Sequence, residues 1–285
     1  MGLNGIDVSA HQPAGIVASV DADFYIVKTS EGVTWKSPAW RRQADDALAK
    51  GKLLGLYHFD AGNVGWQQEC DHFLNVAHSH IGKALLVWDW EAKAVKQGPD
   101  RLRKILTYLK NQLGFPPLLY SSGSPLKTTG AASLATELDC GIWCANYPLD
   151  KLGQPPTPVA GFRQDLHPAI PSAVIFQYTQ SGRLPGYAPS PGFSGFLDLD
   201  VFFGDAAAWR RYATGSGGVT PPTPPAPPAP AITAPGRTEA TYQVRPGDTL
   251  TGIAARFGTT WQVLARLNNM ADASKILPGQ KVRVR

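Results

Sequence analysis

Apolar runs rich in β-branched residues alternate with amphipathic stretches along residues 1–214. Continuous apolar runs are typical of buried strands, whereas apolar residues at every third or fourth position are typical of a helix. The helical spacing is clearest in residues 100–114, where Leu102, Ile105, Leu106 and Leu109 share one face. The predicted strands are 24–29, 53–59, 84–90, 117–122, 140–147 and 174–179, and a further helix is predicted over 38–51.

This alternation predicts an α/β fold. Apolar strands separated by helices indicate a parallel sheet with both faces covered. The number of strands favours a closed barrel over an open sheet. Helical patterns become rare in the later part of this region, so we predict an irregular (β/α) barrel of the TIM type.

A proline-rich segment separates this region from a short tail. Eight prolines lie between Pro221 and Pro235, and they favour an extended spacer over helix or sheet. In the tail, Leu250, Ile253, Ala254 and Phe257 have helical spacing, and strand-like ends flank the helical part. We predict a barrel domain over 1–214, a linker over 215–240 and a small βααβ module over 241–285.

Charge divides unequally between these parts. Of the 27 basic and 22 acidic residues, residues 215–285 hold eight basic and three acidic ones, which leaves 19 of each sign in residues 1–214. The net charge of +5 therefore lies wholly in the tail. A basic tail attracts nucleic acid, anionic membranes or an anionic cell wall equally well, so charge does not choose among these partners.

The cysteines and the N-terminus bear on the compartment. Cys140 and Cys144 fall in a predicted strand, where four residues span about 13 Å, too far for a disulfide. With Cys70 they are expected to be reduced thiols, as in a reducing compartment. The sequence starts without a secretory signal pattern, and no apolar stretch suits a membrane span. We expect no membrane insertion.

Polar residues follow the predicted strands repeatedly. They are Asp7, Lys28, Glu31, His58, Asp89, Glu91, Gln177 and Asp198. A single polar residue at a strand end is usually just exposed to solvent. A series of them at the same end of a barrel predicts a shared polar cleft.

Asp89 and Glu91 are the most informative members of this series. Residues i and i+2 of a strand point to the same side, so both carboxyl groups can enter one cleft. Two close carboxylates do not readily ionise together, so one of them can keep a proton and act as general acid towards a glycosidic oxygen.

Taken together, these motifs resemble glycoside hydrolase family 25 lysozymes. The resemblance covers residues 3–209 and rests on motifs in the family's order. They are GIDVSAHQ (5–12), FYIVKTSEG (24–32), LLGLYHF (53–59), VWDWE (87–91), IWCANYP (142–148), VIFQYTQSGRLPGY (174–187) and LDLDVFFGD (197–205). The chain carries Asp200 where relatives often have asparagine, which leaves open whether Asp198 or Asp200 faces the cleft.

The resemblance implies a muramidase that cleaves peptidoglycan with retention through substrate assistance. It implies that Glu91 is the general acid/base and that Asp89 orients the substrate's N-acetyl group, with Asp7 and Asp198 in the same subsite. Gln177 is expected to contact substrate. The candidate sugar platforms are Tyr57, Tyr120, Trp143 and Tyr178, with an ordinary place in the barrel core as the alternative for each.

The tail resembles a LysM domain, a family that binds N-acetylglucosamine-containing glycans between two loops. In this sequence the loop residues are Gly247, Asp248 and Thr249, followed by Ile276, Leu277 and Pro278. The expected partner of both domains is bacterial peptidoglycan.

Other functions remain as alternatives. They are a bacterial autolysin of the same activity, a non-catalytic glycan-binding protein and a chitinase-like glycosidase. The lack of a signal, together with the reduced cysteines, favours a bacteriophage endolysin that waits in the host cytoplasm until a holin releases it to the cell wall. We expect a monomer with no cofactor, no metal and no nucleic-acid partner. His72, His78 and His80 lack a metal-site spacing, and Arg101, Arg103 and Lys104 are expected on a solvated helix face.

Overall fold

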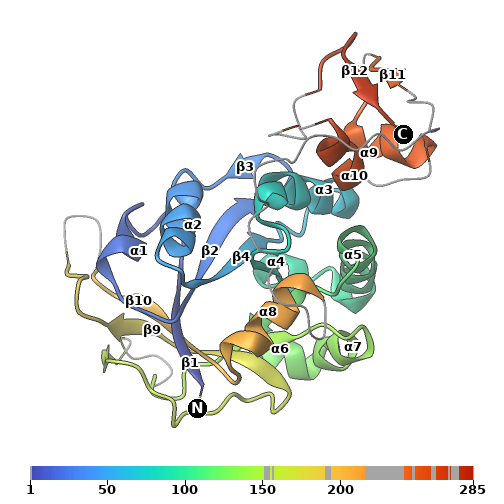
Figure 1. Ribbon diagram of the computed structural model, residues 1–285. Helices are drawn as coiled ribbons and strands as arrows, with labels where there is room; N and C mark the ends of the chain where they lie inside the picture. Colours follow the sequence, from blue (N-terminus) through green and yellow to red (C-terminus); the bar gives the residue numbers. More distant parts are fainter. Residues whose placement is uncertain are drawn as a thin grey trace. The chain divides into compact units, whose positions relative to one another are not determined.

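Eight strands of the N-terminal part close into a barrel, in which each strand pairs with the next and β10 pairs back with β1 (Figure 1). The strands are β1 (Leu3–Val8), β2 (Phe24–Glu31), β4 (Leu53–Phe59), β5 (Leu85–Asp89), β6 (Leu118–Ser122), β7 (Ile142–Ala145), β9 (Ala173–Arg183) and β10 (Leu197–Phe202). The two short strands β3 (Trp35–Lys36) and β8 (Val159–Ala160) pair with β2 and β9. The predicted irregular (β/α) barrel is confirmed.

The structure is a computed structural model and divides into two compact units, Met1–Ser216 and Gly217–Arg285. The residues that it describes are 2–150, 155, 157–189, 194–215, 241–245, 248–257, 261–268, 270 and 276–284. Most of the predicted linker, residues 215–240, lies outside the described residues. Within them, no helix has the length and apolar character needed to cross a membrane.

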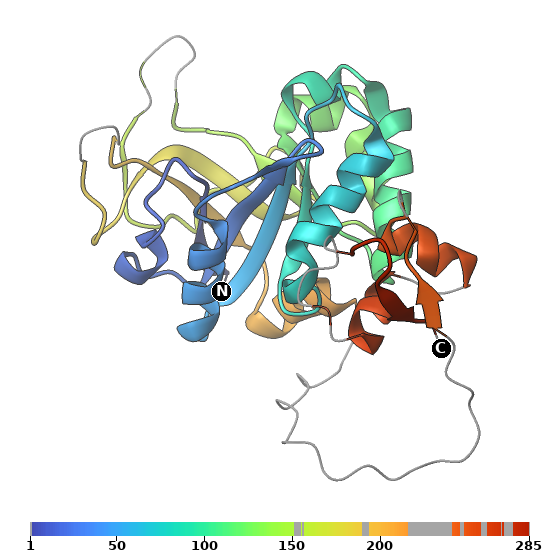
Figure 2. The same ribbon diagram turned by 90° about the horizontal axis from the view of Figure 1, so that it is seen from above.

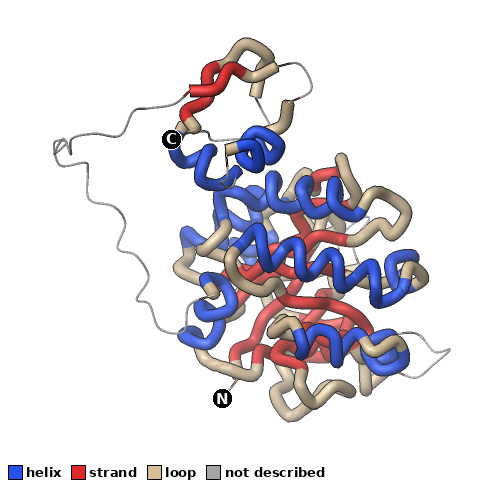
Figure 3. The backbone as a smooth tube through the Cα atoms, turned by 90° about the vertical axis from the view of Figure 1, so that its right-hand side faces the viewer, coloured by secondary structure: helices blue, strands red, loops and turns tan. Residues whose placement is uncertain are grey.

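Helices cover the outside of the parallel strands, whereas loops flank β9 and β10 (Figures 2 and 3). The longer helices of this unit are α2 (Trp40–Ala49), α3 (Trp66–Ala77), α5 (Gly98–Leu113), α7 (Ala131–Glu137) and α8 (Ala206–Thr214). The short ones are α1 (Ile16–Ser19), α4 (Ala92–Val95), α6 (Gly123–Thr128) and a 3₁₀ turn at His78–His80. The scarcity of helices late in the barrel agrees with the sequence pattern.

Helix α5 follows its predicted pattern, with one correction. Its buried residues are the four predicted leucine and isoleucine positions, and it ends at Gly114 in the left-handed conformation, φ 79°. Arg101, however, does not belong to a solvated face. Its side chain is only 12% exposed because it pairs with the fully buried carboxylates of Asp60 and Glu69. Composition alone could not show this, since both partners lie more than thirty residues earlier.

Strand β10 runs against the direction of its neighbours. All barrel pairings from β1 through β9 are parallel, but β10 is antiparallel to both β9 and β1. Asp198 therefore lies at the start of its strand, not after a strand end as the sequence pattern suggested. Because the strand is reversed, its start meets the carboxyl ends of the others, and Asp198 pairs in register with Asp7.

The interior of the barrel is apolar at the end opposite Asp198. Phe24 and Phe202 are fully buried there, and the indole of Trp209 from α8 packs on both rings at centroid distances of 4.6 and 5.2 Å. The indole Nε1 donates to the carbonyl of Leu54. Gly5 leaves room for Phe24, since a Cβ there would lie 2.1 Å from the phenyl ring. Helix α8 thus closes this end of the barrel.

The C-terminal unit has the predicted order of strand, helix, helix and strand. Its elements are β11 (Thr241–Gln243), α9 (Leu250–Arg256), α10 (Trp261–Leu267) and β12 (Lys281–Arg283), with the two strands antiparallel. Ile253, Leu264 and Val282 are fully buried in a small apolar core. Asn268 joins α10 to β12, because its side chain bonds to the backbone N–H and carbonyl of Arg283.

Candidate active site

Carboxyl groups gather at the polar end of the barrel. Asp7 on β1 is 6% exposed and Asp200 on β10 is fully buried. Asp198 and Asp200 are two residues apart on one strand, so both face the barrel interior, with Asp200 the deeper of the two. The sequence left open which of the two faces the cleft, and in the structure both lie on the same side of β10.

Gln177 connects this group to two tyrosines. Its Nε2 donates to Asp7 Oδ2 at 2.6 Å. Its Oε1 accepts hydrogen bonds from the hydroxyls of Tyr120 at 3.0 Å and Tyr147 at 2.8 Å. Since the amide can donate and accept at once, it fixes the position of one carboxyl group and two phenol rings.

Trp143 supports the deeper carboxylate. Its Nε1 donates to Asp200 Oδ1 at 2.8 Å, and its ring packs against Tyr120 with centroids 4.5 Å apart. Tyr57 also packs edge-on against the indole, with ring centroids 6.1 Å apart. Trp143 is only 2% exposed, so it fills the barrel interior and holds Asp200 in place.

Asp89 and Glu91 complete the polar end from β5. Asp89 is 4% exposed, and its Oδ1 is buried without a hydrogen-bond partner among the described residues. Glu91 follows the strand in an extended conformation, φ −144° and ψ −174°, and is partly exposed. The extended backbone keeps both side chains on the same side.

Burial sets the protonation of this group. Loss of water raises the pKa of Asp7, Asp89, Asp198 and Asp200 well above the ordinary value, and repulsion between the carboxylates adds to the rise. Burial also raises the pKa of Glu91, while the Lys28 ammonium opposes the rise. The interaction between the neighbouring Asp7 and Asp200 carboxyl groups adds to the rise in the pKa of Asp7 and offsets only part of the rise in the pKa of Asp200. Such a group holds protons at pH values where isolated carboxyl groups are ionised.

Most, but not all, of the candidate residues come together. Tyr178 is fully buried, and its hydroxyl accepts from the Arg163 N–H, away from the hydrogen bonds that join Gln177 to Asp7 and the other tyrosines. Tyr147 was missed, although it follows β7 as the other polar residues follow their strands. Lys28 was noticed only as a strand-end residue. Its ammonium pairs with Glu31 at 2.8 Å and lies 4.5 Å from the centre of the Phe59 ring.

The histidines have other partners. His72 bonds to the carbonyl of Trp35, and His80 lies 3.5 Å from Asp45. Among the residues described, no group of three or more His, Cys, Asp or Glu side chains has the arrangement of a metal site. The three cysteines are free and buried, as expected from their spacing.

The family model for glycosyl hydrolases family 25 matches residues 5–187, which run from within β1 to beyond the end of β9 and include the Asp89–Glu91 pair. The chain belongs to glycosyl hydrolases family 25. The LysM domain model matches residues 242–285, so the C-terminal unit is a LysM domain.

Individual proteins resemble different parts of this family 25 chain. The "Autolytic lysozyme" of Clostridium acetobutylicum is 25% identical over 207 residues, which are 70% of this chain and 56% of that protein. The "N-acetylmuramoyl-L-alanine amidase sle1" of Staphylococcus saprophyticus is 51% identical over 47 residues, 16% of this chain and 14% of the amidase. The chain thus spans about half of the first relative and a small part of the second.

A solved structure shares the fold of the family 25 barrel. The bacterial lysozyme from Streptomyces coelicolor superposes with a TM-score of 0.56 at 22% identity, covering 75% of this chain and 98% of the lysozyme. This likeness agrees with the irregular barrel described above.

In the LysM domain, the candidate glycan-binding loops lie near each other. Gly279 donates to the carbonyl of Val244 at 2.7 Å, which ties the second loop to the chain just before the first. Asp248 uses its carboxylate internally, since Oδ2 accepts from Tyr242 and from the Arg245 N–H. Thr249 similarly accepts from the Gly252 N–H. Leu277 is 69% exposed and Pro278 is exposed beside partly buried Ile276, whereas Gly247 lies outside the described residues.

The raised pKa values predict a stability gain from removing one carboxyl group of the family 25 barrel. A carboxyl group whose pKa is raised on folding lowers the free energy of unfolding as the pH rises through the folded-state pKa. Below the unfolded-state pKa of about 3.9, the group is protonated in both states and makes no difference to stability. Asp198→Asn should therefore raise the free energy of unfolding at pH 7 by about 0.5–2 kcal/mol, and the gain should vanish below about pH 3.5.

Thermal melts of both proteins across pH 3–8 would measure this difference. Asp165→Asn is the matched control, because an exposed ion pair with Arg163 lowers the pKa of Asp165 to about 2. That variant should show no gain at pH 7. A gain for Asp198→Asn that persists unchanged at pH 3 would contradict the electrostatic explanation.

Proposed function

We propose that this family 25 chain is a lysozyme that hydrolyses the β-1,4 bond between N-acetylmuramic acid and N-acetylglucosamine in bacterial peptidoglycan. The observation that carries the proposal is the Asp89–Glu91 pair at the end of β5, among three further carboxyl groups, in a barrel of this family. Pairs of carboxyl groups with raised pKa values are the usual machinery of glycoside hydrolysis.

Glu91 is proposed as the general acid/base. Burial raises its pKa, so it can hold a proton at the start of the reaction and donate it to the glycosidic oxygen. Its partial exposure leaves it accessible to a sugar chain. The same carboxylate can then take a proton from the water that completes hydrolysis.

Asp89 is proposed to orient the N-acetyl group of the substrate. Its Oδ1 is buried without a partner in the described part of the chain, which is costly unless a substrate group satisfies it. The acetamido N–H is a donor of the required kind. Held this way, the acetamido carbonyl oxygen attacks the anomeric carbon as the glycosidic bond breaks, and water later opens the resulting ring. Two displacements at one carbon give overall retention.

The remaining candidates are proposed to shape the subsite around these two groups. Asp7 and Asp198 line it as acidic walls, and Gln177 holds Asp7 in place. Tyr57 and Tyr120 are the rings best situated to contact a sugar, since Trp143 is almost fully covered. Tyr178 is fully buried and its hydroxyl is bonded to the Arg163 N–H, so it is not retained in the proposed site.

The LysM domain is proposed to hold the enzyme on peptidoglycan. Support comes from the exposed Leu277 and Pro278 beside the first loop, and from the internal bonds of Asp248 and Thr249 that keep this loop in shape. Backbone groups of these residues, including Gly247, are the proposed glycan contacts.

The site of synthesis is proposed to be the cytoplasm of a bacterial host, with release to the wall by a holin, as in a bacteriophage endolysin. Three free, buried thiols support a reducing compartment. A bacterial autolysin is the second candidate, favoured by the name of the Clostridium acetobutylicum relative.

Product analysis tests the proposed bond directly. Purified peptidoglycan digested with the full chain should yield fragments with reducing N-acetylmuramic acid ends, identified by mass spectrometry after borohydride reduction. Reducing N-acetylglucosamine ends would assign a different glycosidic bond, and new free amino groups would indicate peptide or amide cleavage. An absence of any release would favour the non-catalytic glycan-binding alternative.

Glu91→Gln should abolish turnover while leaving the fold unchanged, because glutamine keeps the shape of glutamate and lacks the transferable proton. The expected loss in kcat is about 10²–10⁴. Glu137→Gln is the matched control, since Glu137 is exposed and pairs with Arg103 on the surface. Turnover by Glu91→Gln within tenfold of the parent would remove Glu91 from its proposed role.

The isolated tail, residues 237–285, should sediment with purified peptidoglycan. Its positive charge adds an attraction that salt screens, whereas glycan contacts resist salt. Binding should therefore fall in part between low and physiological salt and then level off. Complete release at moderate salt would reduce the interaction to ion exchange and contradict glycan recognition by the LysM domain.

A further inference from the structure

A buried ionic cluster lies on the outer side of the barrel wall, directly behind Asp89. Arg101 of α5 donates to both carboxylate oxygens of Asp60 at 2.8 and 2.6 Å and to Glu69 of α3 at 2.9 Å. Trp88 of β5 donates its Nε1 to Asp60 at 3.0 Å. We call these four residues the Arg101 cluster.

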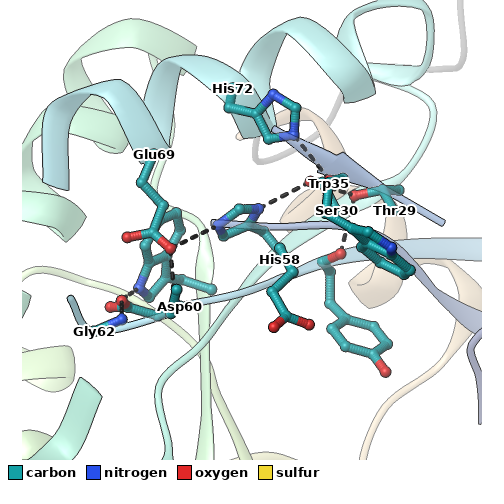
Figure 4. A network of polar contacts seen from close by, with 12 residues as sticks. Thr29, Ser30, Trp35, His58, Asp60, Gly62, Glu69 and His72 are labelled. Atoms are coloured by element: carbon teal, nitrogen blue, oxygen red, sulfur yellow. Dashed lines mark hydrogen bonds and ion pairs between the residues drawn. The ribbon is translucent and has the colours of Figure 1, made fainter. Parts of the chain in front are cut away.

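A neutral histidine, His58, lies next to the Arg101 cluster. Figure 4 shows His58 between Ser30 and Glu69, within hydrogen-bonding distance of both. Burial lowers the pKa of His58 to about 3, so it adds no charge at neutral pH. Arg101 is therefore the cation that faces the carboxylates of Asp60 and Glu69, both of which are fully buried on their side chains.

The cluster holds the short loop that follows β4. The Ala61 N–H donates to Glu69 Oε1 at 2.7 Å, and the Gly62 N–H donates to Asp60 Oδ1 at 2.9 Å. Gly62 has φ +73°, a conformation that glycine adopts without strain. Two carboxylates anchored by one guanidinium thus fix the backbone of residues 60–62.

This loop contacts the catalytic segment on both sides of Glu91. Before Glu91, the Asp60 N–H donates to the carbonyl of Asp89 at 3.0 Å. After it, the loop approaches α4 so closely that a Cβ on Gly62 would lie 2.6 Å from both the Ala94 nitrogen and the Lys93 carbonyl carbon. No side chain larger than hydrogen fits between the loop and α4 without displacing one of them.

The segment that is held in this way contains a strained residue. Ala92, directly after Glu91, has φ +48°, a region that non-glycine residues rarely adopt. Such a conformation persists only where the surrounding structure imposes it. On the other flank, the Trp90 N–H donates to the carbonyl of Tyr120 at 2.9 Å, which fixes the chain against β6.

We propose that Arg101 is a positioning residue that acts through the loop at residues 60–62 to hold Asp89 and Glu91 in their reactive arrangement. Its guanidinium fixes two carboxylates, these fix the loop, and the loop fixes the backbone before and after Glu91. The proposal rests on the proposed role of Glu91. It predicts that loosening the loop lowers kcat with little change in KM, because substrate contacts elsewhere remain.

The first test displaces the loop without changing any charge. Gly62→Ala inserts a methyl group against Ala94, and Gly51→Ala is the matched control, with φ +67° and open space around its Cβ. Amide hydrogen exchange by mass spectrometry, without substrate, reports on residues 89–97. Gly62→Ala should exchange there at least tenfold faster than the parent, and Gly51→Ala should not. Equal exchange in the two variants would overturn the proposal.

The second test changes the guanidinium itself. Arg101→Lys keeps the charge and loses the planar fork that reaches both carboxylates. Arg103→Lys is the control, because Arg103 also donates from both terminal nitrogens, but to the single exposed carboxylate of Glu137. Per folded molecule, Arg101→Lys should lower kcat at least tenfold and leave KM within twofold of the parent. It should also shift the part of the kcat–pH profile that reports the protonation of Glu91. Arg103→Lys should match the parent.

These outcomes separate positioning from a purely structural role. If Arg101→Lys lowers the melting temperature but leaves kcat per folded molecule and the pH profile unchanged, Arg101 only stabilises the fold and the proposal fails. If the parent chain releases no sugar fragments, the proposed function fails. Hydrogen exchange at residues 89–97 still decides in that case whether the loop holds the segment.

Discussion

An eight-stranded barrel closes around an interior just wide enough for side chains, and this constraint governs the rest of the catalytic unit. Every inward position of such a barrel must be filled by a side chain. Trp209 and the phenyl rings that it contacts fill one end. The carboxyl groups of Asp7, Asp89 and Asp200 fill the other and lose most of their hydration. Their raised pKa values follow from where the strands place them.

Such crowding opposes folding, and other parts of the chain offset it. Gln177 and Trp143 each donate a hydrogen bond to one of the crowded carboxylates, and the Lys28 charge lies close enough to affect Glu91. Behind the wall, the Arg101 cluster and the hydrogen bonds of the 60–62 loop add contacts to the same strand ends. The buried carboxyl groups destabilise the interior, but the contacts around them leave them little freedom to rearrange.

The sequence predicted the parallel part of the barrel well because each strand there is apolar on both faces and each helix has one apolar stripe. Leu102 to Leu109 on α5 are an example. It also predicted that Asp89 and Glu91 share a side. It did not predict the reversal of β10, because strand direction leaves no trace in apolar periodicity. Arg101 was misjudged for a related reason: residue type does not show which side of a wall a side chain occupies, or which distant carboxylate it meets.

The pairing of β1 with β10 has a consequence for the order of events during synthesis. Leu3 pairs with Phe202, so β1 leaves the ribosome nearly a whole domain ahead of β10, its last neighbour in the barrel. Asp7 and Asp198 come together in that same pairing. A nascent or truncated chain therefore has a partial wall and an unfinished acidic site. The complete acidic site therefore arrives only with barrel closure, when β10 takes its place beside β1.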